Sequence, residues 1–466
     1  MSKHQFLEMR IPIDENNPSI QRIEEKCIKC GACRRICETD IAVGRLYDLD
    51  STGDCPICIN CGQCANVCPA NSIIERYEYL DVKKAIADPE KIVIFNTSPS
   101  VRVALGEEFG LEAGTFAEGK MVAALRTLGA DYVLDTNFSA DLTIMEEASE
   151  LVSRITEKKK PLPQFTSCCP AWVKFIETFF PEILPHISTA KSPIGMQGPT
   201  VKTYFAKQNG IDPRKIVNVA VTPCTAKKFE IRREEMNAAS KEIGILGMRD
   251  MDHVITTREL ANLIKESGVD FKALDDSDYN TLMGAASGAG VIFGNTGGVT
   301  EAAARTAYYF VTGENPPNGF LNLEPVRGME GIRSAIVDMA GTQVRVAVVH
   351  GIDNAKQVVE ELIAGKCQYD FIEVMACRGG CIGGGGQPKT TVPMTDEIRK
   401  ARINSLYEKD SKMTLRTSHD NPDIKAVYER YYEKPLSPLA ERLLHTVYYS
   451  RSNDLGQKGM VEKPLK

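Results

Sequence analysis

The chain has 466 residues, of which 43% are hydrophobic, and a formal net charge of −6 at pH 7. This length suffices for two or three domains with sizeable cores. No apolar run is long enough for a membrane span, and no basic stripe interleaved with aromatic residues predicts nucleic-acid binding. Because the polar start lacks a signal-peptide core, we expect a cytoplasmic protein that binds neither membranes nor nucleic acid.

Two cysteine arrays occupy the first part of the chain, where nine of the fifteen cysteines lie. In a reducing compartment such clustering favours metal ligation over disulfides. The spacing is that of bacterial two-cluster ferredoxins, in which the fourth cysteine of each array ligates the other cluster. We therefore expect two 4Fe-4S clusters, one on Cys27, Cys30, Cys33 and Cys68 and the other on Cys37, Cys58, Cys61 and Cys64.

A structural zinc site is the alternative, but eight ligands in the ferredoxin register fit zinc poorly. Cys55 is surplus: it could replace Cys58, yet its spacing to Cys61 is too long for the pattern, so we expect a buried, unligated thiol. Residues 1–86 are therefore predicted to form a small ferredoxin-like α+β domain, whose first 22 residues form an arm able to add a strand. A linker at 84–89 leads to the next domain.

Short apolar runs alternate with helical patterns from about residue 90 onward, which is typical of an α/β fold with largely parallel sheets. The predicted strands are 91–95, 132–134, 216–221, 290–293, 344–349 and 371–374. The predicted helices include 116–128, 140–158, 258–267, 300–311 and 354–364. The polar residues 451–466 are expected to form a flexible tail.

Three later segments each place cysteine in a tight turn: residues 166–172, 222–230 and 375–388. Together they contain Cys168, Cys169, Cys224, Cys377 and Cys381. Cys224 and Cys377 directly follow predicted strands, at the carboxyl ends where α/β sheets usually build their sites. The four cysteines other than Cys168 are enough for one more cubane iron–sulfur cluster, beside which Cys168 would be a free thiol.

These segments resemble the signature motifs of the FeFe (iron-only) hydrogenases, and the resemblance extends from about Cys27 to about Tyr449. It implies a two-lobed α/β catalytic domain over 87–402, with a small-subunit-like segment over 403–450 packed on it. It also implies that a third 4Fe-4S cluster is held by Cys169, Cys224, Cys377 and Cys381. Cys381 would bridge this cluster to a di-iron subcluster that carries carbonyl, cyanide and a bridging dithiolate amine.

The resemblance assigns further residues to the di-iron pocket. Lys227, oriented by Glu230, would donate a hydrogen bond to a cyanide ligand, and residues 383–386 would bring backbone amides close to the cofactor. The other residues expected there are Thr222, Met375, Ser192 and Ile194. Well-known members usually have methionine where Thr222 stands, glutamine at Ile194, proline at Arg378 and asparagine at Gly383, so we expect a divergent subgroup.

The predicted helix over 140–158 is a candidate proton path. Glu147, Glu150 and Arg154 fall on one side of it, next to an apolar stripe. A solvated salt-bridge face would give the same pattern, but the surrounding sequence resembles the proton-channel helix of the hydrogenases. The resemblance implies a relay of Cys168, Glu150, Ser188, Glu147 and Arg154, in which Cys168 is the first carrier.

The leading hypothesis is an enzyme that interconverts molecular hydrogen with two protons and two electrons. Its electrons would come from ferredoxin or a similar low-potential carrier, and maturation proteins would supply the di-iron subcluster. One alternative is a hydrogen sensor or a subunit of an electron-bifurcating complex. Another is a non-enzymatic iron–sulfur assembly factor of the related eukaryotic type, which would lack the complete di-iron pocket.

Overall fold

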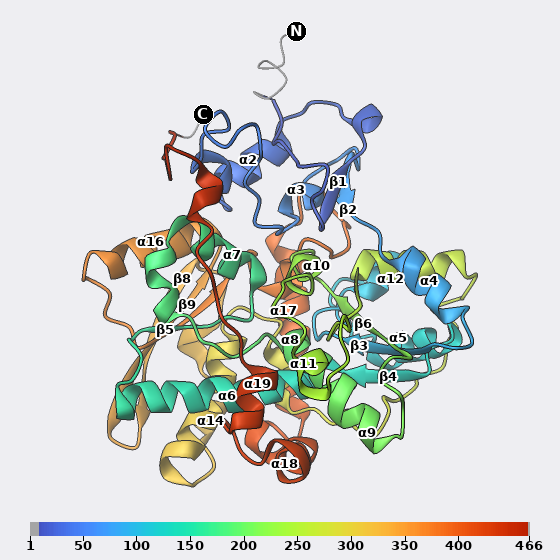
Figure 1. Ribbon diagram of the computed structural model, residues 1–466, viewed down its shortest axis with the longest axis vertical. Coiled ribbons are helices and arrows are strands. Elements are labelled where there is room, and N and C mark those ends of the chain that lie inside the picture. Colours follow the sequence, from blue (N-terminus) through green and yellow to red (C-terminus); the bar gives the residue numbers. More distant parts are fainter. Residues whose placement is uncertain (1–8, 465–466) are drawn as a thin grey trace.

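A computed structural model describes residues 9–464 and places an amino-terminal region on top of two α/β lobes (Figure 1). One lobe contains a four-stranded parallel sheet with the order β4-β3-β6-β7. The other has the order β5-β10-β9-β8 and is parallel except for the β8–β9 pair. The predicted α/β class with mostly parallel sheets is confirmed.

The strand bounds are β3 Ile92–Thr97, β4 Tyr132–Asp135, β5 Gln164–Phe165, β6 Ile216–Thr222, β7 His253–Thr256, β8 Ile332–Met339, β9 Thr342–His350 and β10 Phe371–Met375. The longer helices are α5 Glu118–Thr127, α6 Thr136–Glu157, α7 Pro170–Phe179, α8 Pro193–Thr200, α12 Thr257–Glu266, α14 Gly298–Thr312, α16 Ile352–Ile363 and α17 Asp396–Lys412. Shorter helices are α9 Ala206–Gln208, α10 Lys227–Glu230, α11 Ala238–Ile243, α13 Gly288–Ile292, α15 Asn318–Leu321, α18 Pro422–Val427 and α19 Pro438–Leu444.

The strands predicted from apolar runs coincide with β3, β4, β6, β9 and β10, with one exception. Residues 290–293 were predicted as a strand, but they belong mostly to the helix α13, which begins after the N-cap Ser287. All five residues of α13 are buried, so its sequence has no polar face that would reveal a helical period. The strands β5, β7 and β8 were not predicted.

The amino-terminal region pairs β1 (Ile20–Arg22) with β2 (Ile73–Glu75) in an antiparallel sheet. The expected extra strand is therefore present, although residues 1–8 of that arm lie outside the described residues. Two short helices, α2 (Ala32–Glu38) and α3 (Gln63–Asn66), each begin within a cysteine array after a glycine in the left-handed conformation. The helix α4 (Tyr79–Ile86) extends into the predicted linker and contacts α12 of the catalytic region.

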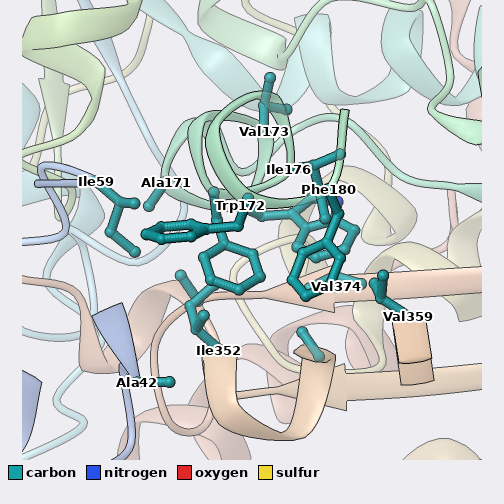
Figure 2. Packing of buried hydrophobic residues seen from close by; sticks show 14 of the residues in the cluster. Ala42, Ile59, Ala171, Trp172, Val173, Ile176, Phe180, Ile352, Val359 and Val374 are labelled. Atoms are coloured by element: carbon teal, nitrogen blue, oxygen red, sulfur yellow. The ribbon is translucent and has the colours of Figure 1, made fainter. Parts of the chain in front are cut away.

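A hydrophobic core joins the amino-terminal region to the β10 lobe. Ala42 and Ile59 pack with Trp172 and Ile176 of α7, and with Ile352 at the start of α16 (Figure 2). Trp172 is 0% exposed and Ile59 2% exposed. The amino-terminal region is therefore built onto the catalytic region through a shared core, and deletion of residues 1–86 would expose apolar surface on α7.

The carboxyl-terminal segment also binds the amino-terminal region, in contrast to the predicted flexible tail. Leu455 is 2% exposed and belongs to the same core. The Val461 and Lys463 N–H groups donate hydrogen bonds of 3.1 and 2.9 Å to carbonyl oxygens of Leu46 and Arg45. The segment 451–464 is thus anchored at these points, although most of its side chains are exposed, and Figure 1 shows it in red rising beside the blue region. The expected boundary at 402 falls inside α17.

We expect Leu455→Ala to lower the free energy of unfolding by about 2–5 kcal/mol, the usual range for truncating a buried leucine. Anaerobic denaturant unfolding of the cluster-loaded protein measures the effect. Leu246→Ala is the matched control, because Leu246 is 96% exposed, and it should leave the unfolding midpoint unchanged. An equal midpoint for both variants would contradict the packed position of this segment.

Candidate active site

A cavity of about 70 Å³ lies where strands of both lobes end. The strand β6 ends at Thr222, just before Cys224, and β10 ends at Met375, just before Cys377. The segment after β5 supplies Cys168 and Cys169. The residues that line the cavity include all five cysteines of the three motifs, together with Lys227, Thr222, Met375, Ile194, Phe293, Ala140, Ser98, Ser100 and Thr136.

The chemistry of these cysteines fits an iron–sulfur cluster. Burial, followed by charge repulsion from Cys169, raises the pKa of the Cys224 thiol to about 12. Burial, and then Cys224 and Cys169, likewise raise the pKa of Cys381. Several thiolates this close together in a buried space need a cation, and the iron of a cubane binds thiolates and neutralises their charge. The expected ligand set Cys169, Cys224, Cys377 and Cys381 therefore fits the cavity.

Two hydroxyl groups in the cavity wall were missed by sequence reasoning. Ser100 Oγ and Thr136 Oγ1 are buried, and neither has a hydrogen-bond partner among the described residues. Buried polar groups of this kind are normally satisfied, so their orphaned state fits a polar ligand in the cavity. Ser100 follows β3 and Thr136 follows β4, and this position after a parallel strand was the available signal.

Lys227 reaches the cavity from the first residue of α10. Its Nζ donates hydrogen bonds to the Cys168 carbonyl oxygen at 3.1 Å and to Glu230 Oε2 at 2.8 Å. Although burial lowers the pKa of Lys227, the Glu230 charge and then Cys224 raise it overall, so the ammonium stays protonated. Ser192 does not line the cavity; its hydroxyl donates to Glu230 Oε2 at 3.0 Å and caps α8.

The glycine run matches the expectation only in part, because Gly384 lines the cavity but the amides of the run are largely used elsewhere. The amides of Gly384 and Gly386 donate to the carbonyl oxygens of Cys381 and Pro223, at 3.0 and 2.8 Å, so they are not free for a cofactor. A Cβ at Gly385 would overlap the Cys61 carbonyl oxygen. The glycines therefore permit close contact between this loop and the second cysteine array.

Four positions differ from the residues usual in well-known hydrogenases, and they form two pairs, one that lines the cavity and one that does not. Thr222 and Ile194 line the cavity. Arg378 is absent from its wall and forms an ion pair of 2.7 Å with Asp396 at the start of α17. Gly383 is absent from the wall as well. Only the first pair is placed to change the surroundings of a cofactor.

The relay residues lie together in the interior. Glu147, Glu150 and Arg154 of α6 are all buried, which excludes the solvated salt-bridge face. Glu150 accepts hydrogen bonds from Ser188 Oγ at 2.9 Å and from Arg154 Nη2 at 2.7 Å. Glu147 lies close enough to Cys168 to raise the pKa of that thiol, in addition to the effect of burial. Among the predicted relay residues, Glu147 is therefore the carboxyl group near Cys168, and Ser188 and Arg154 both bond to Glu150.

The two carboxyl groups of the candidate relay, Glu147 and Glu150, differ strongly in acidity. Burial, and then repulsion by Glu150, raise the pKa of Glu147 to about 8. Burial acts in the same sense on Glu150, but Arg154 and then Lys160 lower its pKa to about 2. Lys160, which sequence reasoning missed, has a side chain that is 43% exposed, and its Nζ lies 2.9 Å from Glu150 Oε1. It connects the buried carboxylate to the surface.

The amino-terminal cysteines form two groups in space. A cavity of about 30 Å³ is lined by Cys37, Cys58, Cys61 and Cys64, the four cysteines predicted to share one cluster. Cys27 and Cys68 of the other predicted set both contact Ser72, whose N–H donates to Cys68 Sγ at 3.3 Å. Cys30 of that set is exposed, so the second site lies at the surface. Cys55 is exposed and not buried as predicted, because it lies in a surface turn.

These features define an iron–sulfur oxidoreductase with a buried reaction site, and comparisons with known proteins identify its family. The model of the iron-only hydrogenase large subunit, C-terminal domain, matches residues 91–385. The model of the iron hydrogenase small subunit matches residues 396–451. The chain belongs to the iron-only hydrogenase family and is an enzyme of the hydrogenase class.

Individual relatives agree with this membership. The periplasmic [Fe] hydrogenase large subunit of Nitratidesulfovibrio vulgaris is 47% identical, over 86% of this chain and 94% of that protein. The NADP-reducing hydrogenase subunit HndD of Solidesulfovibrio fructosivorans is 45% identical, over 93% of this chain and 75% of that protein. A solved [FeFe]-hydrogenase from Chlamydomonas reinhardtii has a TM-score of 0.70 at 40% identity and covers 81% of this chain and 99% of its own.

A second group of relatives consists of assembly proteins. The cytosolic iron-sulfur assembly component 3 of Bos taurus is 33% identical, over 79% of this chain and 76% of that protein.

Among the described residues, no helix is both long and apolar enough to cross a membrane. The cytoplasmic location stays a prediction, and one relative is named as periplasmic.

Proposed function

We propose that the chain catalyses the reversible conversion of molecular hydrogen into two protons and two electrons. The observation that carries this proposal is one cavity that holds five cysteines and Lys227. Glu147 lies near one of these cysteines, Cys168, and Gln63, which lines the second cysteine-lined cavity, bonds to another, Cys377. A di-iron subcluster with carbonyl, cyanide and dithiolate amine ligands would supply the hydrogen chemistry, held by the 4Fe-4S cluster through Cys381.

The residues around the cavity have separate functions in cluster binding, cofactor contact, exclusion of water and proton transfer. Cys169, Cys224, Cys377 and Cys381 bind the cubane, and Lys227 donates a hydrogen bond toward the cofactor while Glu230 holds its ammonium in place. Met375 and Ile194 contribute apolar wall that excludes water, and the hydroxyl residue Thr222 lines the cavity beside them. Cys168 carries the proton to Glu147, from which it passes by way of Ser188 and Glu150 toward Lys160 at the surface. Arg154 positions Glu150 and keeps it anionic.

Electrons enter through the amino-terminal clusters. The exposed Cys30 marks the cluster nearest the surface, and the site formed by Cys37, Cys58, Cys61 and Cys64 lies between it and the active site. The donor or acceptor is ferredoxin or a similar low-potential carrier. The 45% identity to a protein named as a subunit of an NADP-reducing hydrogenase supports a second candidate, in which the carrier is a partner subunit.

The assembly-factor alternative is less well supported by the site. Cys168, Lys227 and Cys381 all line the cavity, so the groups expected at a di-iron subcluster are present together with those of the cubane. An assembly factor would need only the iron–sulfur ligands.

The test is production with and without hydrogenase maturation proteins. Without them we expect about twelve irons per chain, from three cubanes of four irons each, and no hydrogen production. With them, carbonyl and cyanide bands should appear in the infrared spectrum together with activity. Activity in a sample without those bands would refute the proposal.

The electron route has its own prediction. Cys30→Ser should remove the outermost cubane, and therefore most of the ferredoxin-linked activity, because the exposed cluster is the entry point. Hydrogen production with a small artificial reductant, which reaches the inner clusters directly, should persist. Cys55→Ser is the control: this cysteine is also exposed but has no predicted cluster. Equal ferredoxin-linked rates in both variants would contradict the route.

A further inference from the structure

One side chain connects the two redox sites directly. Gln63 lies between Cys61 and Cys64 in the amino-terminal region, at the start of α3, and is buried. Its Nε2 donates a hydrogen bond of 3.1 Å to Cys377 Sγ and another of 2.9 Å to the Gly383 carbonyl oxygen. Both protons of the amide group are therefore used, and both acceptors belong to the active-site loop.

Other hydrogen bonds hold this contact in place. Asn66 Nδ2 donates to the Gly384 carbonyl oxygen at 2.9 Å, and Thr225 Oγ1 donates to the Asn60 carbonyl oxygen at 2.7 Å. Asn66 is itself held by Arg258, whose Nη1 lies 2.9 Å from Asn66 Oδ1. The Gln63 amide therefore has little freedom to leave the sulfur.

The importance of this hydrogen bond comes from its acceptor, the sulfur of Cys377. Backbone N–H groups donate to other cysteine sulfurs, for example from Asn60 to Cys58 and from Ala376 to Cys169. Gln63 differs because its backbone belongs to one cluster loop while its side chain donates to a ligand of another. A hydrogen bond to a ligating sulfur withdraws electron density and stabilises the reduced cluster, which raises the reduction potential. Burial strengthens such a bond.

We propose that Gln63 is a positioning residue that acts through Cys377 to raise the reduction potential of the active-site cubane relative to its neighbour. The inference rests on the proposed assignment of Cys377 as a cubane ligand. In the step it favours, one electron leaves the cubane on Cys37, Cys58, Cys61 and Cys64 and enters the cubane on Cys169, Cys224, Cys377 and Cys381. The first cluster is oxidised and the second reduced by that electron, and no bond is formed or broken.

The experiment uses the full chain produced without maturation proteins, so that the three cubanes are present and hydrogen chemistry is absent. Electron paramagnetic resonance during a redox titration gives the midpoint potential of each cluster. The active-site cubane is identified as the signal that a Cys169→Ser variant lacks. In Gln63→Leu and Gln63→Met, which remove the donor at similar volume, its midpoint potential should become more negative, with iron content unchanged.

Asn66→Leu is the matched control. It removes a hydrogen bond between the same two loops that ends on a carbonyl oxygen, while the Thr225 bond and both Gln63 bonds remain, so the potential should shift much less than in the Gln63 variants. An unchanged potential in both Gln63 variants would overturn the proposal, as would an equal shift in Asn66→Leu. Loss of the third cubane in both Gln63 variants alone would assign Gln63 to cluster assembly and would also overturn it.

The failure of the underlying assignment would look different. If Cys377 were not a ligand, a Cys377→Ser variant would keep the third cubane and about twelve irons, whereas loss of a true ligand would leave about eight, from two cubanes of four. With matured protein, the Gln63 variants should also favour hydrogen oxidation over hydrogen production more than the wild type does, because an electron reaches the active-site cubane less readily.

Discussion

Cys168→Ser should nearly abolish hydrogen turnover while iron content and the carbonyl and cyanide bands stay at wild-type levels. A serine hydroxyl has a similar shape to the thiol but is a much weaker acid, so it interrupts proton transfer to Glu147. Loss of a general acid–base group typically costs about 100- to 10,000-fold in rate. The carbonyl oxygen of Cys168 also accepts the Lys227 hydrogen bond, and serine preserves that backbone contact.

The neighbouring cysteine is the control for this result. Cys169 lines the same cavity, but we assign it to the cubane, so Cys169→Ser should weaken or remove the third cluster. Iron analysis and infrared spectra are recorded beside activity for both variants. If Cys168→Ser lost the cluster and Cys169→Ser kept it, the two roles would be reversed. If Cys168→Ser were fully active, protons would travel by another route.

Glu147→Gln should have a comparably large effect on turnover, about 100- to 10,000-fold. With a pKa of about 8, the carboxyl group of Glu147 can both accept and release a proton near neutral pH, which an amide cannot do. No hydrogen bond of normal geometry reaches its carboxyl oxygens among the described residues, although Ser188 and the Ser167 N–H lie near enough to lower its pKa against the effect of burial, so the substitution should disturb few structural contacts. The variant should therefore retain its clusters and its infrared bands.

The same substitution should stabilise the fold in a pH-dependent way. The carboxyl group keeps its proton up to about pH 8 in the folded chain, compared with its ordinary pKa of 4.5. Between these two values the unfolded chain binds fewer protons, so the wild type loses stability as the pH rises across this window. Glu147→Gln removes this loss, and its advantage in anaerobic denaturant unfolding should grow toward pH 8.

Glu90→Gln, at an exposed glutamate on the surface, is the control and should show no such trend. Two results would contradict the assignment of Glu147. One is wild-type turnover in Glu147→Gln. The other is a stability difference from the wild type that does not change with pH, because this would mean that the carboxyl group is not held protonated by burial.

The site residues that could be predicted from the sequence are those that belong to a recognisable local motif. Cys224 and Cys377 could be placed because an apolar run and a cysteine stand side by side in the chain. Ser100 and Thr136 carry only the weaker signal of a position after a predicted strand, because ordinary hydroxyl residues become recognisable site residues only when parallel strands bring their loops to one edge. Lys160 is likewise one lysine in a run of three, and only the fold places its Nζ beside Glu150.

Burial decided the cases in which a pattern allowed two interpretations. The charged side of α6 could not be distinguished from a solvated face, since it is covered by segments, at residue 161 and over 185–189, that lie outside the helix. The helix α13 was predicted as a strand for a different reason. It is buried on every side, so its sequence shows no helical periodicity of apolar and polar residues. The packed carboxyl-terminal segment depends on a few contacts such as Leu455, which the polar composition of 451–466 conceals.

The contact between Gly62 and Gly385 has a consequence for the speed of electron transfer. A Cβ on Gly62 would overlap Thr225 Oγ1 and would come within 3.2 Å of the Gly385 Cα, and Gly62 also has a positive φ of 70°. Tunnelling between redox centres slows exponentially with their separation. With the proposed cluster ligands, the absence of two methyl groups would therefore set the length of the tunnelling gap, and alanine at either glycine should lengthen it without altering any ligand.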